Sequence, residues 1–352
     1  MYCLRVGNAH IKGVEMNKSV YAILGTGPLG LWTANDLVHR IGFQEYIVRM
    51  GNRRGRRPAW LPAELQAAEK SGGLEWVAVD ALSEERVSEF ARGAKALVHC
   101  ANPQYNEWEE KLPTMQANSM KAALANSATL VCADNLYSYE APRGTIITES
   151  TPENPPSRKG AVRKQLHEML RSAQTDHGLR WTTIQASDYF GPGASDQSHL
   201  GNRFFDPILA GKKAMFIGGK TMTHSWAYAP DFGRAMALVA RSTDDSLFGR
   251  SWILPSVADC SAQSMTKVFY AELEKQGMLR PGSYQEPGVL PRFLLQFLGL
   301  FNPVIRELDE MRYQFTDDFV ASGAAFVAAT GFEASSLEAA VAETVGFQKG
   351  RR

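Results

Sequence analysis

Cysteine and histidine are few in this sequence of 352 residues, and neither is clustered. The four cysteines, Cys3, Cys100, Cys132 and Cys260, form no C-x-x-C pair, and none of the seven histidines belongs to an H-E-x-x-H motif. This scatter excludes a disulfide framework and the common zinc motifs. We therefore expect a reducing, cytoplasmic location and no bound metal.

Long apolar runs and an excess of one charge are also missing. No uninterrupted apolar run reaches the roughly 20 residues that a membrane-spanning helix needs. Lys and Arg total 38 against 37 Asp and Glu, so the net charge of +1 indicates no basic surface for nucleic acid or anionic lipid. Hydrophobic residues make up 44% of the chain, which is enough for a sizeable core. We expect a globular protein that binds a small-molecule substrate, with neither nucleic acid nor membrane as a partner.

What is present in the first half is an alternation of short apolar runs with segments of helical spacing. The predicted strands are residues 20–24, 46–49, 74–79, 96–100, 129–133 and 181–186, and the predicted helices are residues 31–41, 115–127 and 161–177. This alternation is typical of βαβ units and a parallel sheet. We expect an α/β fold with a Rossmann-like, doubly wound parallel sheet in residues 18–190, after a poorly ordered N-terminal extension of residues 1–17.

The pattern changes in the second half. Residues 191–225 are rich in Gly, Ser and Asn and indicate a loop-dominated insertion. A predicted helix at 230–241 and a predicted strand at 251–255 suggest that residues 228–256 return to the Rossmann sheet. The remainder is helical with Pro and Gly breaks, so we expect residues 191–352 to form a smaller, mainly helical substrate cap.

A glycine-rich turn follows the first predicted strand and opens the first predicted helix. It reads Gly25, Thr26, Gly27, Pro28, Leu29 and Gly30, which is G-x-G-x-x-G. In such a turn the first glycine allows the tight bend, the second allows close approach of a pyrophosphate, and the third lets the helix pack on the strand. The free N–H groups of the helix then face the phosphates. This context predicts a dinucleotide site.

The end of the second predicted strand bears on which dinucleotide binds. NAD sites place Asp or Glu about 20 residues after the glycines to hold the ribose 2′-hydroxyl. Here the strand ends in Arg49, and Asn52 and Arg53 follow, so charge-assisted bonds to a 2′-phosphate are favoured. NADP(H) is therefore the preferred cofactor, NAD(H) is the alternative, and a merely solvated basic loop is the competing interpretation.

Two further strand ends complete the predicted cofactor site. Asp80 closes the third strand, where a carboxylate can reach the adenine amino group. Ala101 and Asn102 follow the fourth strand, beside the expected nicotinamide half.

These features resemble the NAD-dependent epimerase/dehydratase family, which comprises the extended and atypical short-chain dehydrogenases/reductases. The resemblance rests on the glycine turn, the strand end at Asp80, Ala101-Asn102-Pro103, Tyr137-Ser138-Tyr139 and Ser187-Asp188-Tyr189-Phe190-Gly191-Pro192, in that order. It covers about residues 18–347. It implies a Rossmann fold with a nucleotide in its cleft, and a substrate pocket built from the loop after residue 190, the segment near 220 and the C-terminal helices.

The catalytic positions depart from the family's pattern. The resemblance implies a Ser or Thr after the fifth strand and Tyr-x-x-x-Lys on the next helix. The sequence has Asn135, Lys159 and Arg163 at these positions, and no tyrosine lies between Tyr139 and Tyr189. Ordinary tyrosine-based proton transfer from that helix is therefore not expected.

Three interpretations of this departure remain open. In the first, the protein still transfers hydride: Arg163 holds the ribose, and a desolvated Lys159 near other cations, or else Tyr137 or Tyr139, serves as the acid or base. In the second, the protein is a catalytically weak NADP(H)-binding sensor or regulator. In the third, the fold performs a non-redox step on a specialised substrate.

On the substrate side, Asp188 and Tyr189 follow the sixth strand at the sheet edge where open α/β folds bind ligands, and His224 lies in a polar-aromatic stretch. No clear set of basic residues is available for a substrate diphosphate. We therefore favour a small apolar carbonyl compound over a nucleotide sugar, which stays an alternative. The apolar segment 290–301 is expected to pack on the core, with a pocket wall or a homodimer face as alternatives.

Overall fold

The fold is built around a parallel sheet of seven strands in the order β10-β6-β5-β4-β1-β2-β3. The computed structural model describes residues 18–41 and 46–351, so the predicted extension 1–17 lies outside the described residues. The strands are β1 (Ser19–Leu24), β2 (Tyr46–Asn52), β3 (Leu74–Ala78), β4 (Ala94–His99), β5 (Thr129–Asn135), β6 (Trp181–Ala186) and β10 (Arg250–Ile253). The order reverses between β1 and β4, and the predicted doubly wound Rossmann-like sheet is confirmed.

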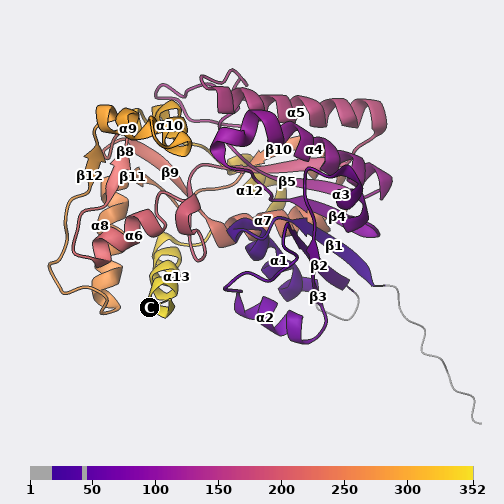
Figure 1. The fold of residues 1–352 in the computed structure, drawn as a ribbon, viewed down its shortest axis with the longest axis horizontal. Helices are drawn as coiled ribbons and strands as arrows, with labels where there is room; N and C mark the ends of the chain where they lie inside the picture. The colour runs from indigo at the N-terminus through magenta and orange to yellow at the C-terminus, as the bar shows by residue number, and fades with distance from the viewer. Residues whose placement is uncertain (1–17, 42–45, 352) are drawn as a thin grey trace, which may run out of the picture.

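Helices cover both faces of this sheet (Figure 1). One face packs on α1 (Pro28–Ile41), α2 (Ala63–Lys70) and α7 (Ala229–Arg241), and the other on α3 (Glu84–Phe90), α4 (Trp108–Ala125) and α5 (Arg158–His177). Neighbouring residues of β5 serve opposite faces, because Leu130 packs with Leu170 of α5 whereas Val131 packs with Met236 of α7. Burial on both faces explains why the strands read as apolar runs without polar alternation.

The segment after β6 contains regular structure that the sequence reading missed. Residues 191–225, expected to be mostly loop, include α6 (Asn202–Leu209), β8 (Met215–Ile217) and the start of β9 (Thr223–Tyr228). The helix α6 is short but buries Phe204, Phe205 and Ile208 on one face, which fixes it by packing. A three-stranded sheet joins β9 to β7 (Tyr189–Phe190) and β11 (Ala258–Ser261), and β8 pairs with β12 (Gly288–Leu290).

The remaining elements form the cap, seen to the left of the main sheet in Figure 1. Its helices are α8 (Ala262–Lys275), α9 (Arg292–Gly299), α10 (Pro303–Glu310), α11 (Tyr313–Thr316) and α13 (Leu337–Gly350). The helix α12 (Ala324–Thr330) contacts β10 of the main sheet. Three single 3₁₀ turns are η1 (Tyr105–Glu107), η2 (Ser195–Gln197) and η3 (Asp245–Leu247). No helix in the described part of the chain is both long and apolar enough to cross a membrane.

The apolar segment around α9 differs from expectation. Within α9 only Leu295 and Gly299 are buried. Phe293 is 74% exposed, and the residues that follow the helix, Leu300 and Phe301, are equally open to solvent. Most of this segment therefore does not pack on the core.

Candidate functional site

The glycine turn lies where β1 and β4 end side by side and the strand order reverses. Gly25 has φ +113°, and a Cβ there would lie 2.6 Å from the Ala101 nitrogen; a Cβ on Gly30 would lie 2.1 Å from the Gly25 oxygen. These two glycines are required by backbone packing. A Cβ on Gly27 would have only Gln197 Oε1 near it, at 3.7 Å. The second glycine therefore borders open space at the start of α1, as a pyrophosphate site requires.

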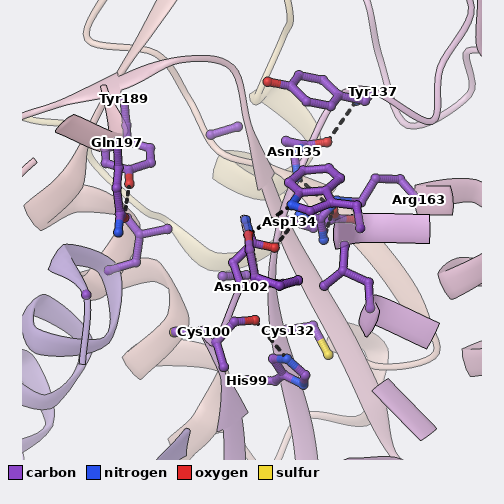
Figure 2. Close-up of a pocket in the computed structure, with 18 of the residues that line it drawn as sticks. His99, Cys100, Asn102, Cys132, Asp134, Asn135, Tyr137, Arg163, Tyr189 and Gln197 are labelled. Atoms are coloured by element: carbon purple, nitrogen blue, oxygen red, sulfur yellow. Dashed lines mark hydrogen bonds and ion pairs between the residues drawn. The ribbon is translucent and has the colours of Figure 1, made fainter. Parts of the chain in front are cut away.

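A cavity of about 520 Å³ opens from this turn. It extends from Gly27, Pro28, Leu29 and Gly30 past Ala101 and Asn102 to the carboxyl ends of β5 and β6 and to residues of the cap. Figure 2 shows the polar side chains around it, with Asn102 between the end of β4 and Arg163 of α5. The predicted cofactor turn and the predicted catalytic strand end are thus parts of one cavity.

Arg49 lies away from this cavity. Its Nε donates to Glu75 Oε2 at 3.1 Å, and its Nη1 donates to the carbonyl oxygens of Phe90 and Arg92 at 2.9 and 3.1 Å. Those carbonyls lie between the end of α3 and the start of β4, at the amino ends of the strands. Contrary to the prediction, the guanidinium that was expected to hold a 2′-phosphate is anchored at the sheet edge opposite the glycine turn.

Asn52, by contrast, does lie beside the turn. Its Nδ2 donates to Thr26 Oγ1 at 3.2 Å, and the loop that follows carries the exposed side chain of Arg53. Asp80 lies after β3, where Oδ1 accepts from the Leu82 N–H at 3.0 Å and the side chain is exposed. Asn52 therefore ties the loop after β2 to the glycine turn, and Asp80 accepts a hydrogen bond within its own turn, but none of Thr26, Asn52, Arg53 and Asp80 lines the cavity that opens from the turn.

Lys159 does not line the cavity. Its side chain is 1% exposed, and its Nζ donates to Glu307 Oε2 and to Glu310 Oε2, the latter at 3.1 Å. The prediction from sequence that Lys159 serves as the acid or base depended on other cations lying near it. The structure surrounds it with two carboxylates instead, so the expected cationic environment is absent from the described contacts of its amine.

Arg163 does face the cavity. Its Nη1 pairs with Asp134 Oδ1 at 3.1 Å, its Nη2 donates to Asn102 Oδ1 at 3.4 Å, and its guanidinium lies 4.3 Å from the centre of the Trp108 ring. Arg163 is 8% exposed, and its buried Nε has no hydrogen-bond partner in the protein. A buried donor without a partner is costly. Arg163 therefore combines a lining position on the cavity with an unsatisfied N–H beneath it.

The tyrosines after β5 have different environments. Tyr137 lines the cavity, and its hydroxyl lies 2.8 Å from the hydroxyl of Tyr105, another lining residue. Burial raises the pKa of both phenols, to about 12 for Tyr105. Tyr139 is buried elsewhere and donates to Gln185 Oε1 at 2.8 Å, so it does not reach the cavity. Asn135 also lines the cavity, where its Oδ1 accepts from the Tyr137 N–H at 3.1 Å.

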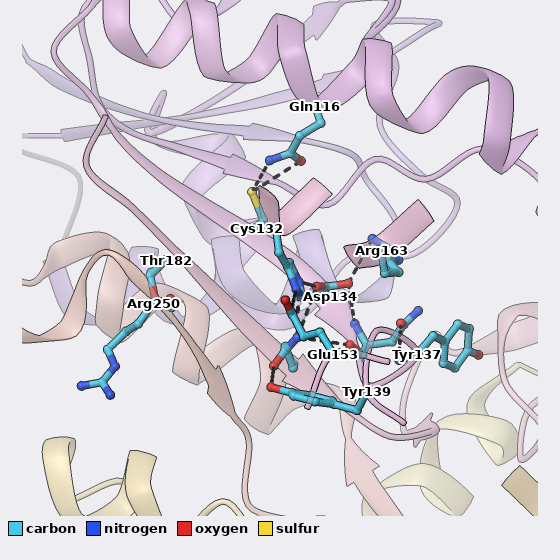
Figure 3. A network of polar contacts seen from close by, with 12 residues as sticks. Gln116, Cys132, Asp134, Tyr137, Tyr139, Glu153, Arg163, Thr182 and Arg250 are labelled. Atoms are coloured by element: carbon cyan, nitrogen blue, oxygen red, sulfur yellow. Dashed lines mark hydrogen bonds and ion pairs between the residues drawn. The ribbon is translucent and has the colours of Figure 1, made fainter. Parts of the chain in front are cut away.

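A buried ionic network lies under the end of β5 (Figure 3). His167 of α5 is 1% exposed, and its two ring nitrogens contact Asp134 Oδ2 and Glu153 Oε1. Burial alone would lower the pKa of His167, but the two carboxylates raise it to about 9. Burial would likewise raise the pKa of Asp134, but Arg163 and His167 hold it below its usual value. At neutral pH this network holds a charged imidazolium.

On the cap side, Asp188 and Tyr189 line the cavity, and the Tyr189 hydroxyl donates to Gln197 Oε1 at 3.2 Å. His224 lies behind Asp188, with Nε2 2.8 Å from Asp188 Oδ2, and it is 2% exposed. Although burial acts to raise the pKa of Asp188, His199 and His224 lower it. Of the three predicted substrate residues, His224 is thus a support for Asp188 and not a lining group.

The sequence analysis did not identify most of the residues that line the cavity, among them the polar residues His99, Tyr105, Asp134 and His167. Burial lowers the pKa of His99 to about 4, and its Nε2 lies 3.0 Å from the Ala101 carbonyl oxygen, which helps fix the end of β4. One signal was available, because His167 follows Arg163 by four residues and so shares its helix face. Among the described residues, no group of three or more His, Cys, Asp or Glu side chains is arranged to hold a metal.

Comparison with known proteins points to one family. The model of the NAD dependent epimerase/dehydratase family matches residues 25–253. No curated protein matches the sequence.

Solved structures share the fold at low sequence identity. A dTDP-glucose 4,6-dehydratase from Streptomyces venezuelae, solved with NAD, is 15% identical with a TM-score of 0.72, over 95% of this chain and 98% of that one. A UDP-glucuronic acid 4-epimerase from Bacillus cereus, solved with UDP-glucuronic acid and NAD, is 13% identical with a TM-score of 0.73, over 95% and 100% of the two chains. A UDP-glucose 4-epimerase from Thermus thermophilus, solved with NAD, is 17% identical with a TM-score of 0.68, over the same shares.

Replacement of Gly27 by valine tests the dinucleotide site. A Cβ at this position meets only Gln197 Oε1, at an ordinary contact distance of 3.7 Å, whereas the branched side chain would occupy the space that a pyrophosphate needs. We expect NADH and NADPH binding, measured by fluorescence titration, to weaken by at least about 2 kcal/mol, or roughly thirtyfold. The far-UV circular dichroism and melting temperature should remain those of the wild type. Gly30→Ala is the contrasting variant, because its Cβ would collide with the Gly25 carbonyl and should lower stability. Unchanged binding by the Gly27→Val protein would place any nucleotide elsewhere.

Replacement of His167 by glutamine tests the charged network. A folded-state pKa near 9, above the ordinary value of about 6.5, means that the protonated imidazole stabilises the fold fully below pH 6.5 and that this contribution is lost as pH rises through 9. The difference in unfolding free energy between wild type and His167→Gln should therefore be on the order of 3 kcal/mol larger near pH 6 than near pH 10. His177→Gln, exposed on the same helix, is the control and should show no such trend. A difference that does not vary with pH would mean that His167 is neutral in the folded protein.

Proposed function

Because the chain belongs to the NAD-dependent epimerase/dehydratase family, we propose that it is an NAD(P)-dependent oxidoreductase acting on a small carbonyl-type substrate. The observation that carries this proposal is the single cavity lined by the glycine turn, by Arg163 and by Tyr137. The site for the cofactor pyrophosphate, a residue that can contact its ribose and a source of a proton would then lie around one cavity.

The residues present fit a dinucleotide. The open position at Gly27 and the N-terminus of α1 would hold the pyrophosphate. Arg163 would hold the nicotinamide ribose in place of the family's lysine, steadied by Asp134, Asn102 and the Trp108 ring. When bound, the cofactor supplies or accepts a hydride at the substrate carbon.

The protein must then move a proton at the substrate oxygen, and Tyr137 is the candidate. Tyr137 lines the cavity, and its hydroxyl is paired with that of Tyr105, another lining residue. Because burial raises the pKa of both phenols, they stay protonated at neutral pH, so Tyr137 has a proton to donate and is not available as a base. This favours reduction of a carbonyl, in which the Tyr137 proton passes to the substrate oxygen.

The cavity also supports a small substrate over a nucleotide sugar. Its arginines are Arg163, already bonded to Asp134, and Arg203 of α6, which donates to the Asp196 carbonyl at 2.8 Å. A substrate diphosphate needs several uncommitted cationic or N–H donors. A sensor that binds the dinucleotide without turnover is the alternative that the experiments below separate from an enzyme.

Replacement of Tyr137 by phenylalanine tests the proton donor. Turnover of NADPH or NADH with a panel of aldehydes and ketones should fall by about 10²–10⁴ with little change in cofactor affinity, as expected for a lost general acid. Tyr139→Phe is the matched control, because Tyr139 is a buried tyrosine two residues away that bonds only Gln185 and lies outside the cavity. Full activity in Tyr137→Phe would remove this residue from the mechanism. Tight cofactor binding by the wild type without turnover of any carbonyl in the panel would support the sensor.

The cofactor preference has its own test. Residues 46–57 contain no Asp or Glu, and Arg53 is exposed in the loop that Asn52 ties to Thr26. We expect NADPH to bind more tightly than NADH, and Arg53→Ala to remove about 1.5–3 kcal/mol of that preference as a charge-assisted phosphate contact is lost. Arg49→Ala should leave the preference unchanged, because its guanidinium is bonded to Glu75 and two backbone carbonyls. Equal wild-type affinities for the two cofactors would contradict the preference.

A further inference from the structure

Lys159 occupies the position at which the family resemblance places the catalytic tyrosine, yet its amine points away from the cavity into the cap. We infer that Lys159 is a positioning residue that locks helix α10 in place as a closed wall of the cavity. The inference rests on the proposed function for its effect on turnover, but the lock itself is a property of the protein without ligand.

The contacts of Lys159 all lead to α10 and to Tyr105. Its Nζ donates to Glu307 and Glu310, one turn apart on α10, and lies 5.5 Å from the centre of the Tyr105 ring. The backbone N–H groups of Arg158 and Lys159 both donate to Glu310 Oε1, so the same carboxylate caps the start of α5. The positive end of that helix adds to the attraction for both carboxylates.

Besides Lys159, the exposed Arg158 also pairs with Glu307 and Glu310, but apolar packing adds little to hold α10 in place. Of the α10 side chains that the structure describes, Glu307 is the buried one, at 5% exposure. Helix α10 therefore buries a charged side chain against the protein, where a packed helix normally buries apolar ones. The preceding helix α9 buries only Leu295 and Gly299, so the α9–α10 pair gains little from the core. Elements with few buried apolar contacts are the first to open locally.

Helix α10, which Lys159 holds in place, forms part of the candidate site. Leu308 of α10 lines the cavity, and α10 contacts the turn η1 that carries Tyr105. The Tyr105 hydroxyl in turn bonds the Tyr137 hydroxyl at 2.8 Å. If the ammonium is removed, Glu307 and Glu310 lose their buried cation and keep only exposed guanidinium groups, that of Arg158 near both and that of Arg306 near Glu307. Breaking a buried ion pair in this way is strongly unfavourable. Helix α10 should then move toward solvent and widen the cavity.

The first experiment measures amide hydrogen exchange in the protein without ligand. In Lys159→Met, exchange across residues 303–310 and 105–107 should accelerate by at least about tenfold, with exchange in β4 and β5 unchanged. Lys159→Arg keeps the charge and should retain wild-type protection. Lys121→Met is the control, because Lys121 pairs with Glu84 on the exposed surface of α3 and α4 and should leave α10 unaffected. Wild-type protection of α10 in Lys159→Met would overturn the inference.

A second variant covers the case in which Lys159→Met does not fold. Glu310→Gln keeps a side chain of the same size but removes one of the two charges that hold the lysine, and it should raise exchange in α10 by a smaller factor. Unchanged exchange in that variant would also count against the lock.

Kinetics then separate a positioning role from a catalytic one. A loosened wall should raise KM by about tenfold and leave the pH profile of kcat in its wild-type form, with Lys159→Arg restoring KM. A proton donor would instead lose kcat and change its pH profile, and arginine, which does not release its proton, would not rescue it. That second result would overturn the inference. Absence of any turnover in the wild type would contradict the proposed function and leave the hydrogen-exchange result to decide the lock.

Discussion

The close contact between the glycine turn and the end of β4 is the constraint on which the site depends. No side chain fits on Gly25, because its Cβ would lie 2.6 Å from the peptide that joins Cys100 to Ala101. The ends of β1 and β4 can therefore meet side by side, while the helices that follow them, α1 and α4, leave toward opposite faces of the sheet. The space between these departing chains is the cavity, and its position follows from the strand order.

Buried charge is the second organising feature, and two groups of buried, oppositely charged side chains lie beside the cavity. Asp134 is shared by Arg163 and His167, and Lys159 is shared by Glu307 and Glu310. An unpaired charge at these depths would be too costly to keep. A lysine at the family's tyrosine position therefore requires carboxylates nearby, and the cap supplies them from α10. Lys159 of α5 and the two glutamates of α10 therefore depend on each other: the lysine replaces the tyrosine that the family resemblance implies, and α10 supplies its counter-ions.

The aromatic residues beside the cavity link these charges to the hydroxyl pair. The Trp108 ring lies between Arg163 on one side, at 4.3 Å, and the stacked Tyr105 ring on the other, at 4.8 Å between centroids. Tyr105 contacts the Lys159 ammonium through its ring and Tyr137 through its hydroxyl. These contacts connect Lys159 and α10 with the hydroxyls of Tyr105 and Tyr137, so a movement of α10 would displace those hydroxyls.

The sequence by itself was sufficient to predict the Rossmann sheet. Strands that are buried on both faces appear as apolar runs, and the turn after the first strand needs glycine for backbone reasons that are visible in the sequence. Of the predicted site residues, Arg163, Asn102, Asn135, Tyr137 and Asp188 line one cavity, since each lies at or near the edge of the sheet where the strands end. The sequence did not reveal that Arg49 is held at the opposite edge or that Tyr139 is turned toward Gln185. Nor did it reveal the partners of Lys159, which lie about 150 residues away in the sequence. The environment of a charged side chain is set by groups that only the tertiary structure brings near it, and for that reason the chemistry of α5 was decided by the packing of the cap.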